Sequence, residues 1–170
     1  MLFRSRVLEI GAGYCDWINQ VRAAGRVAVD IWPEVARYAG SGVSAKVLDI
    51  SRDLPTLGRA AFDIVLASNV IEHFEPEAAA LLVRDIATVL APGGRLLIVG
   101  HHPADHESGA RRPHGPGLMF SADDVLGLLG EVEGFDTWTV EVAEEPQRVQ
   151  ETPEGPLPVT DTVVRVRRPF

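Results

Sequence analysis

The stretch VLEIGAGYCDW, Val7 to Trp17, decides how this chain is expected to fold. Its first four residues form a short apolar run that is typical of a buried β-strand, and Gly11 and Gly13 supply a turn at which a ligand can approach the backbone. Because a helical pattern follows, the stretch predicts the strand, glycine turn and helix with which α/β proteins bind nucleotides.

The residue at position 16 argues against a ligand that carries phosphates. The dinucleotide-binding pattern G-x-G-x-x-G would place a third glycine there, whereas this chain has Asp16. A carboxylate at the start of the expected helix would cap the free amides itself and would repel a pyrophosphate. We therefore expect a cofactor without phosphate groups.

Short apolar runs alternate with amphipathic segments along the rest of the chain. Five of these runs are expected to form strands buried on both faces of a parallel sheet: residues 7–10, 27–31, 47–50, 62–67 and 95–100. Residues 138–142 and 162–168 alternate polar and apolar positions and are predicted to pair in antiparallel fashion at the end of the sheet. The sequence thus predicts a doubly wound α/β fold with a mostly parallel, seven-stranded sheet whose last strand is antiparallel.

Helices are expected between these strands, at residues 15–24, 33–40, 76–90 and 121–130. Pro76 suits the first turn of the third helix, and Ser121 with Asp124 forms the S-x-x-D pattern of a capping box. Residues 101–119 and 144–160 are rich in Gly, Pro or Glu and are expected to form loops. Since a loop as long as 101–119 is uncommon in a compact domain, it is a candidate for a functional segment.

The composition indicates a small acidic protein. The 170 residues suffice for one domain with a substantial core, so we expect a single domain over residues 1–170. The formal charge of −8 would repel nucleic acid and anionic membranes. The chain has no apolar run of membrane-spanning length, no secretion signal and a single cysteine. We predict a cytoplasmic protein with a small-molecule partner, and with neither nucleic acid nor membrane as a partner.

Three acidic residues are expected to lie at one rim of the sheet. Glu9, Asp30 and Asp49 each stand at or near the end of one of the first three strands, and the carboxyl ends of parallel strands face a common crevice. Asp30 follows the first glycine by about 20 residues, the separation at which an acidic side chain meets a ribose diol. Each carboxylate alone could merely cap a turn, but three in register with a glycine turn favour a ligand with donors and positive charge.

An ordered set of motifs extends this pattern: VLEIGAG, AVDIWP, KVLDIS, FDIVLASNVIEHF and LAPGGRLLIV. In order and spacing they resemble the class I S-adenosylmethionine-dependent methyltransferases, and the resemblance covers about residues 6–100. It implies that S-adenosylmethionine is the cofactor and that a methyl group is transferred to a small-molecule acceptor.

The resemblance also implies which residues would contact the cofactor. The methionine part would lie against Glu9, Gly11, Ala12 and Gly13. Asp30 would hold the ribose hydroxyls, and the adenine would lie among Ile31, Trp32, Asp49 and Ile50. The sulfonium would face Ser68 and Asn69.

The chain departs from the family at two places. Members often have a third glycine where this chain has Cys15, and they usually have N-terminal cap helices before the first strand, whereas here only MLFRS precedes it. Either the cofactor is more exposed here, or the true chain is longer, or something else covers the site. For the last case we expect the loop at 101–119 or a second subunit in a homodimer to be the cover.

Two histidines are candidates for a catalytic base. Methyl transfer from a sulfonium is an in-line displacement that needs alignment, exclusion of water and, for some acceptors, a base. His73 follows the fourth strand and His101 the fifth, although His73 could instead fix a helix start and the loop histidines could be surface residues. A metal site at His102, Asp105, His106 and His114 lacks an established pattern, so no metal is expected.

Other functions fit the sequence less well. A short-chain nicotinamide oxidoreductase would carry Y-x-x-x-K, yet Gly42 stands four residues before the only lysine, Lys46. Nucleic-acid amino-methyltransferases typically carry D/N-P-P-Y/F after the fourth strand, where this chain reads SNVI. The alternative that remains is a non-catalytic domain that binds S-adenosylmethionine, or the partner subunit of a methyltransferase.

Overall fold

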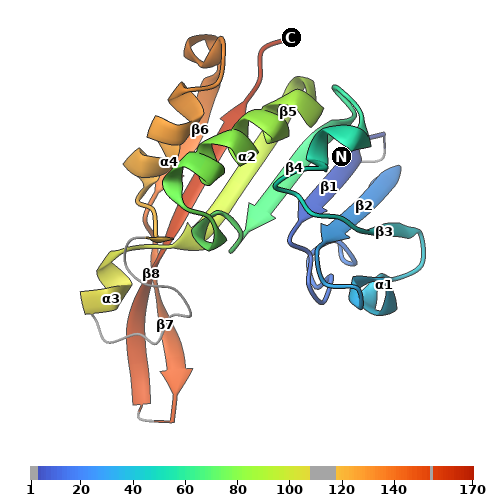
Figure 1. Ribbon diagram of the computed structural model, residues 1–170. Helices are drawn as coiled ribbons and strands as arrows, with labels where there is room; N and C mark the ends of the chain where they lie inside the picture. Colours follow the sequence, from blue (N-terminus) through green and yellow to red (C-terminus); the bar gives the residue numbers. More distant parts are fainter. Residues whose placement is uncertain (1–3, 108–117, 154) are drawn as a thin grey trace.

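The computed structural model describes residues 4–107, 118–153 and 155–170 (Figure 1). Its strands are β1 (Arg6–Ile10), β2 (Gly25–Asp30), β3 (Val43–Val47), β4 (Phe62–Ser68), β5 (Leu90–His101), β6 (Thr139–Glu144), β7 (Gln147–Thr152) and β8 (Gly155–Arg167). Its helices are α1 (Val35–Tyr38), α2 (Pro76–Val89), α3 (Ala104–Glu107) and α4 (Ala122–Gly130), with short 3-10 helices η1 (Leu54–Leu57), η2 (Ile71–His73) and η4 (Phe135–Thr137). Among these, no helix is long and apolar enough to cross a membrane.

The sheet has the order β3-β2-β1-β4-β5-β8-β6, with β7 paired to the projecting part of β8. The first five strands of the chain are mutually parallel, and β8 runs antiparallel to both β5 and β6. This order confirms the mostly parallel sheet with an antiparallel last strand, although the sheet has eight strands rather than seven because β7 adds one.

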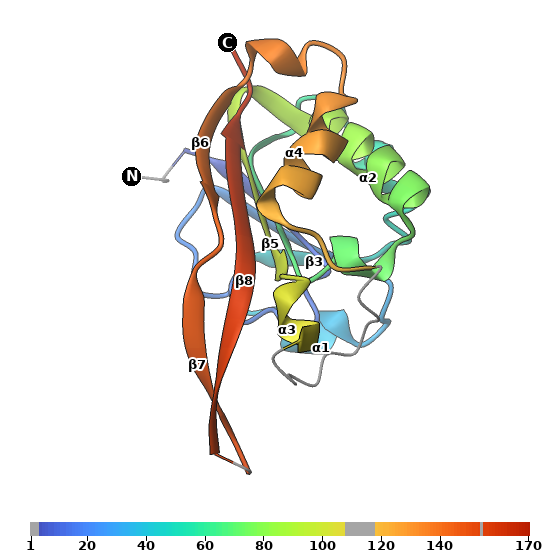
Figure 2. The ribbon, with the colours of Figure 1, turned by 90° about the vertical axis from the view of Figure 1, so that its left-hand side faces the viewer.

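Two cores lie on opposite faces of this sheet. Successive residues of a strand point to opposite faces, so on β1 the buried Leu8 belongs to one core and the buried Val7 to the other. The larger core contains the apolar side chains of α2 and α4, and Figure 2 shows both helices on the same side of the strands. The smaller core contains Val35 of α1 together with Cys15 and Ile18.

The two long helices begin and end where the sequence predicts. Pro76 opens α2, and the helix ends at Val89, with only Leu90 between it and the A-P-G-G segment at 91–94. At the start of α4, the Ser121 hydroxyl accepts a hydrogen bond from the Asp124 amide, and the Asp124 carboxylate accepts one from the Ser121 amide at 2.8 Å. This reciprocal pair is the expected capping box.

The helix expected at residues 15–24 is absent, and the segment forms a series of turns. Cys15 adopts a left-handed backbone conformation with a φ of 59°, which an α-helix cannot contain. Its buried side chain belongs to the smaller core, and packing there holds the residue in this conformation. Apolar spacing alone therefore gave a wrong prediction at this position.

Three other expectations need correction. The third strand is β3 at Val43–Val47 rather than 47–50, so Asp49 lies in the turn that follows it. The helix expected at 33–40 contracts to the four residues of α1. Residues 144–160 are not simply a loop, because most of them form β7 and the first part of β8. These residues are largely exposed on both faces and thus lack the apolar periodicity that marks a buried strand.

β7 and residues 155–160 of β8 form a two-stranded arm that projects from the body (Figures 1 and 2). Since His101 at the end of β5 is paired with Asp161, the arm extends beyond the carboxyl ends of the parallel strands. The buried carboxylate of Asp105 in α3 accepts a hydrogen bond from the Thr160 amide at 2.6 Å. The loop expected at 101–119 thus contains α3, and its residues 108–117 lie outside the described residues.

Candidate functional site

Two adjoining hollows lie at the carboxyl edge of the sheet. The first has a volume of about 470 Å³ and is lined by Gly11, Asp30, Ile31, Asp49, Ile50, Ser51, Asn69, Val70, His73 and Phe74. The second has a volume of about 510 Å³ and is lined by Glu9, Gly11, Ala12, Tyr14, Asp16, Trp17, Leu66, Ser68, Asn69, Leu97 and Val99. Both hollows border Gly11 and Asn69, so a single ligand could extend across these two residues from one hollow into the other.

The glycine turn after β1 is shaped by its neighbours. Gly11 has a φ of 66°, and a Cβ at this position would overlap the side chain of Val70. Gly13 has a φ of 47°, and a Cβ there would meet no other group within 4 Å, so open space lies beside its backbone. Glycine is therefore required at the first position by close packing and at the second by backbone conformation.

Asp30 fixes this turn with both of its carboxylate oxygens. One oxygen accepts the Gly13 amide at 2.8 Å, and the other accepts the Trp32 amide at 2.8 Å. Each oxygen retains a second lone pair, so the carboxylate can still accept hydrogen bonds from a diol in the first hollow. The predicted place of Asp30 at the rim is consistent with this geometry.

Asp49 lies in the turn after β3 and is held by Ser51. Its carboxylate accepts the Ser51 hydroxyl at 2.6 Å and the Ser51 amide at 3.0 Å. These hydrogen bonds hold the pKa of Asp49 below its ordinary value. Within the described part of the chain the amide of Ile50 donates no hydrogen bond, and it is therefore available to a ring nitrogen in the first hollow.

Glu9 lies almost buried beneath the second hollow, with 7% of its surface exposed. Its carboxylate accepts the Ile18 amide at 3.1 Å. Burial raises the pKa of Glu9 to about 7, although the hydrogen bond from Ile18 opposes this effect, and the nearby negative charge of Asp16 adds to it. The amide of Ile18 is thus bound by Glu9, whereas Asp16 was expected to cap a helix here.

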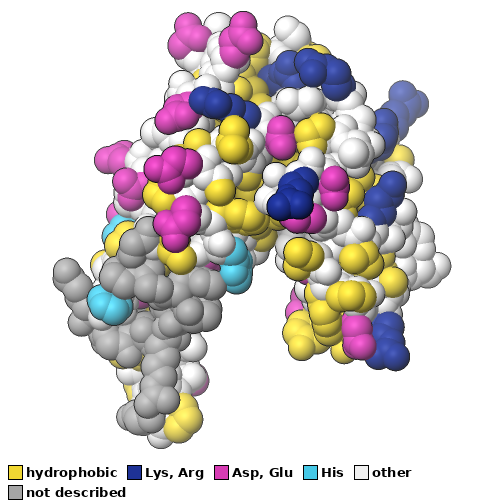
Figure 3. All heavy atoms as spheres, viewed as in Figure 1, with side chains coloured by type: hydrophobic (Ala, Val, Ile, Leu, Met, Phe, Trp, Pro, Cys, Tyr) yellow, Lys and Arg dark blue, Asp and Glu magenta, His cyan; other side chains and the backbone are white. Residues whose placement is uncertain are grey.

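The second hollow has an apolar wall. Leu66, Leu97 and Val99 line it from β4 and β5 on the sheet face opposite α2 and α4. Tyr14 and Trp17 line it from the turns after β1. Figure 3 shows the molecule deeply notched at this edge, between the part that carries α1 and the part that carries the arm.

Tyr14 belongs to a cluster of three aromatic rings. Its ring meets Trp32 edge-on at a centroid distance of 5.4 Å and Tyr38 edge-on at 4.8 Å. Trp32 and Tyr38 are stacked at 5.4 Å. Edge-to-face and stacked pairs of this kind are favourable, so the Tyr14 ring is held in place although 60% of its surface is exposed.

The histidines differ in their environments. His73 is exposed and lines the first hollow, whereas His101 ends β5 and lines neither hollow. His102 has a structural role, because its Nδ1 accepts the Ala104 amide at 3.1 Å and its Nε2 lies 3.2 Å from Glu145. Of the residues at 4–107, 118–153 and 155–170, no three His, Cys, Asp or Glu side chains form a group that could hold a metal ion. His114 lies outside the described residues.

The two hollows bring together most of the residues that the sequence singles out. Three of these residues line neither hollow: Gly13, Trp32 and His101. Gly13 and Trp32 nevertheless donate their backbone amides to Asp30. Sequence reasoning missed the residues that complete the walls: Tyr14, Trp17, Ser51, Leu66, Val70, Phe74, Leu97 and Val99. Asp16, which the sequence singled out only as a residue that would repel phosphate, also lines the second hollow. The D-I-S triplet at 49–51 could have indicated Ser51, but the apolar residues read as ordinary core and gave no such signal.

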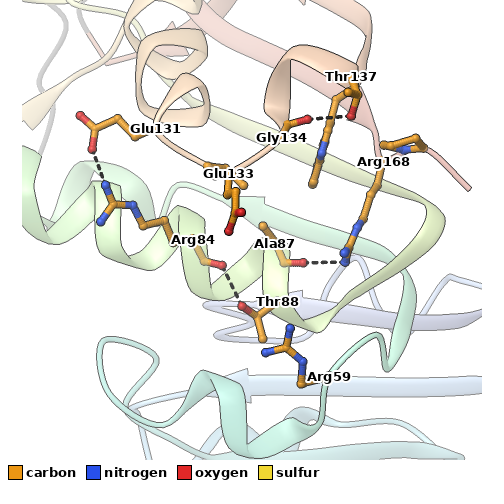
Figure 4. A pocket seen from close by; sticks show the side chains of 12 residues that line it. Arg59, Arg84, Ala87, Thr88, Glu131, Glu133, Gly134, Thr137 and Arg168 are labelled. Atoms are coloured by element: carbon orange, nitrogen blue, oxygen red, sulfur yellow. Dashed lines mark hydrogen bonds and ion pairs between the residues drawn. The ribbon is translucent and has the colours of Figure 1, made fainter.

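A third hollow lies at the other end of α2 and has a volume of about 560 Å³ (Figure 4). Its charged groups largely serve the fold. Arg84 pairs with Glu131 at 3.0 Å, and the Arg168 guanidinium donates to the carbonyls of Ala87 and Leu90 at the end of α2. Being remote from the glycine turn, this hollow is not the candidate site.

The comparisons with known proteins agree with this geometry. Residues 8–98, just over half of the chain, match the family described as methyltransferase domain. No curated protein matches the sequence.

Several solved structures share the fold. NodS, an N-methyltransferase from Bradyrhizobium japonicum WM9, has a TM-score of 0.70 and 19% identity, with 99% of this chain and 88% of that chain covered. An S-adenosylmethionine-dependent methyltransferase from Mesorhizobium loti has a TM-score of 0.67 and 18% identity, covering 98% and 92%. A 1,6-didemethyltoxoflavin-N1-methyltransferase from Burkholderia thailandensis, with S-adenosylhomocysteine bound, has a TM-score of 0.69 and 21% identity, covering 99% and 72%.

Proposed function

The chain belongs to the methyltransferase domain family, and on that premise we propose that it transfers the methyl group of S-adenosylmethionine to a small-molecule acceptor. The observation that carries the proposal is the pair of hollows that meet at Gly11 and Asn69. Their volumes, about 470 and 510 Å³, are in the range of small-molecule sites, and together they leave room for an acceptor beside the cofactor. NodS and the toxoflavin enzyme, which share the fold, are named as N-methyltransferases, and the latter was solved with 1,6-didemethyltoxoflavin bound.

The cofactor is S-adenosylmethionine, and the donor groups of the first hollow fit its adenosine part. We assign the ribose hydroxyls to Asp30 and the adenine edge to Asp49 and the Ile50 amide, with Ile31 and Trp32 flanking the ring. Support comes from Asp30, which lines the hollow and retains acceptor capacity on both oxygens, and from the Ile50 amide, which donates no hydrogen bond within the described part of the chain.

The methionine part is assigned to the turn after β1, where the open space beside Gly13 leaves the backbone accessible. Glu9 and Ala12 border the second hollow there, and Ser68 with Asn69 is assigned to the sulfonium side. When bound, S-adenosylmethionine supplies an electrophilic methyl group on a positively charged sulfur.

The chain itself contributes alignment, exclusion of water and a base. The apolar wall of the second hollow would exclude water from the acceptor and hold it in line with the methyl group. We assign the base to His73, because it lines the first hollow, which adjoins the second hollow at Asn69, and histidine accepts protons near neutral pH. His101 is the second candidate, since it ends β5, next to the strand that carries Ser68.

Calorimetry and a turnover assay test the proposed function. S-adenosylhomocysteine should bind, and Asp30→Ala should weaken its binding by about 1–3 kcal/mol, the effect of losing hydrogen bonds to the ribose. Asp30→Asn keeps one acceptor oxygen and should have a smaller effect, while Asp123→Ala, an exposed carboxylate on α4, should have none.

The turnover assay, run with a panel of small acceptors, tests catalysis. A methylated product that decreases in His73→Gln would support the assignment of the base, and His101→Gln serves as the comparison. Tighter binding of NAD than of S-adenosylhomocysteine would contradict the proposal. Cofactor binding with no product from any acceptor would favour the non-catalytic alternative.

A further inference from the structure

The second hollow carries negative charge and aromatic surface together. Its two carboxylates are Glu9 and Asp16, and among the residues that the structure describes no Lys or Arg lines either hollow. On the same sheet face, Arg95 and Arg165 each lie 3.0 Å from Glu141 and are thereby neutralised in part. Because burial raises the pKa of Glu9 to about 7, Asp16 supplies most of the negative charge near neutral pH. The local field in the hollow therefore attracts a cation and repels an anion.

Asp16 is placed at the rim of this hollow and is not used by the fold. It is exposed, and in the described part of the chain its carboxylate neither accepts a hydrogen bond nor forms an ion pair. The other carboxylates of the two hollows are occupied by backbone amides: Glu9 by Ile18, Asp30 by Gly13 and Trp32, and Asp49 by Ser51. Asp16 is thus the carboxylate with the most capacity left for a ligand.

Tyr14 precedes Asp16 by two residues and Trp17 follows it directly, and both aromatic residues line the second hollow together with Asp16. The Tyr14 ring is fixed by its contacts with Trp32 and Tyr38, so it does not lose conformational freedom when a ligand packs on it. An aromatic face beside a carboxylate is the combination that binds ammonium groups through cation–π and Coulomb attraction. The apolar wall of Leu66, Leu97 and Val99 would bind the uncharged hydrocarbon part of such a ligand.

We propose that Tyr14, Asp16 and Trp17 form an acceptor subsite for a small molecule that carries an ammonium group on an apolar body. This inference rests on the proposed methyl transfer and specifies the class of acceptor. A protonated amine has no lone pair to attack the sulfonium, so the anchored ammonium is a recognition group. The nucleophile is another, unprotonated atom of the same acceptor, which gains the methyl group as the carbon–sulfur bond breaks and its electron pair stays on sulfur.

The test uses two probes that share a ring and differ in charge. Benzyltrimethylammonium and phenylacetate are titrated by calorimetry into the full chain saturated with S-adenosylhomocysteine, so that the cofactor's own place is filled. We expect the cation to bind about tenfold more tightly than the anion, which corresponds to about 1.4 kcal/mol. Asp16→Asn and Tyr14→Leu should each reduce this preference to about threefold or less. The control Asp123→Asn removes an equally exposed carboxylate on α4 and should leave the preference unchanged.

Two results would overturn the subsite. One is equal or tighter binding of phenylacetate to the unaltered protein. The other is a loss of S-adenosylhomocysteine affinity in Asp16→Asn as large as its loss of cation affinity, because Asp16 would then bind the methionine ammonium of the cofactor. Failure of S-adenosylhomocysteine to bind the unaltered protein would instead count against the proposed function, so the two failures are distinguishable.

Discussion

At the scale of single residues, Glu9 shows how burial in the site raises the pKa of a carboxyl group. Its ordinary pKa is 4.5, and burial raises the pKa to about 7 in the folded chain. The folded state therefore binds more protons than the unfolded state between these two values, and stability falls as the pH rises through this range. Below pH 4.5 the group is protonated in both states and has no effect.

Glu9→Gln should remove this loss of stability at rising pH. Gln keeps an oxygen that can accept the Ile18 amide but carries no charge. We expect the variant to exceed the unaltered protein in free energy of unfolding by about 3 kcal/mol at pH 8, with the difference shrinking toward pH 5. Urea unfolding at both pH values measures it, and Glu151→Gln on the exposed arm is the control. A difference that is the same at both pH values would argue against a titrating Glu9.

Backbone strain at single residues is also testable. Ala60, in the turn before β4, has a φ of 49° although it is not a glycine. Ala60→Gly should stabilise the fold by about 1 kcal/mol, because a left-handed conformation is unfavourable for alanine. Ala78→Gly, in the first turn of α2, should destabilise it by up to about 1 kcal/mol. Thermal unfolding of the two variants should show midpoints that move in opposite directions.

At the scale of elements, the sequence predicted well those helices and strands whose positions are set by residues close together in the chain. Pro76 and the Ser121–Asp124 pair specify where α2 and α4 begin, and continuous apolar runs marked β1, β4 and β5. Elements that depend on distant contacts were predicted poorly. The turns at 15–24 follow from the packing of Cys15 in the smaller core, and β7 exists because β8 offers it a partner.

The candidate site could likewise be predicted only in part, because local patterns in the sequence indicate some of its residues and distant contacts position the others. Carboxylates and glycines at strand ends are recognisable from type and spacing, so Asp30 and Gly11 could be placed at the rim of the sheet, where they line the first hollow. Tyr14 and Leu97 line the second hollow only because the fold brings the turns after β1 beside β5, and no local pattern contains that information.

The attachment of α3 to β8 gives a prediction about an element. Asp105→Ala removes the acceptor of the Thr160 amide, and a buried amide without a partner costs about 1–3 kcal/mol. We expect faster hydrogen exchange at the Thr160 amide and at neighbouring amides of the arm, with α2 unaffected. Asp105→Asn, which retains an acceptor oxygen, should largely restore protection. Unchanged exchange in Asp105→Ala would show that the arm is held by its strand pairing alone.

At the scale of the whole molecule, the two cores share the strands of one sheet, so we predict that they unfold together as a single domain. The chain contains a reporter for each core, because Trp17 packs against the smaller core and Trp138 against the larger one. Variants that lack Trp32 and keep only one of these two tryptophans should show the same urea midpoint by fluorescence. Separate midpoints would mean that the face carrying α1 is an independently unfolding layer.

The position of β8 has a consequence for synthesis on the ribosome. In chain order β8 follows β6 and β7, yet in the sheet it lies between β5 and β6. The emerging chain therefore completes β1 to β5 and α2 while β5 still presents an unpaired edge, and β6 has no neighbour until residues 155–167 have left the exit tunnel. Throughout that interval the nascent chain exposes an apolar strand edge, which makes it a substrate for chaperones that act during translation.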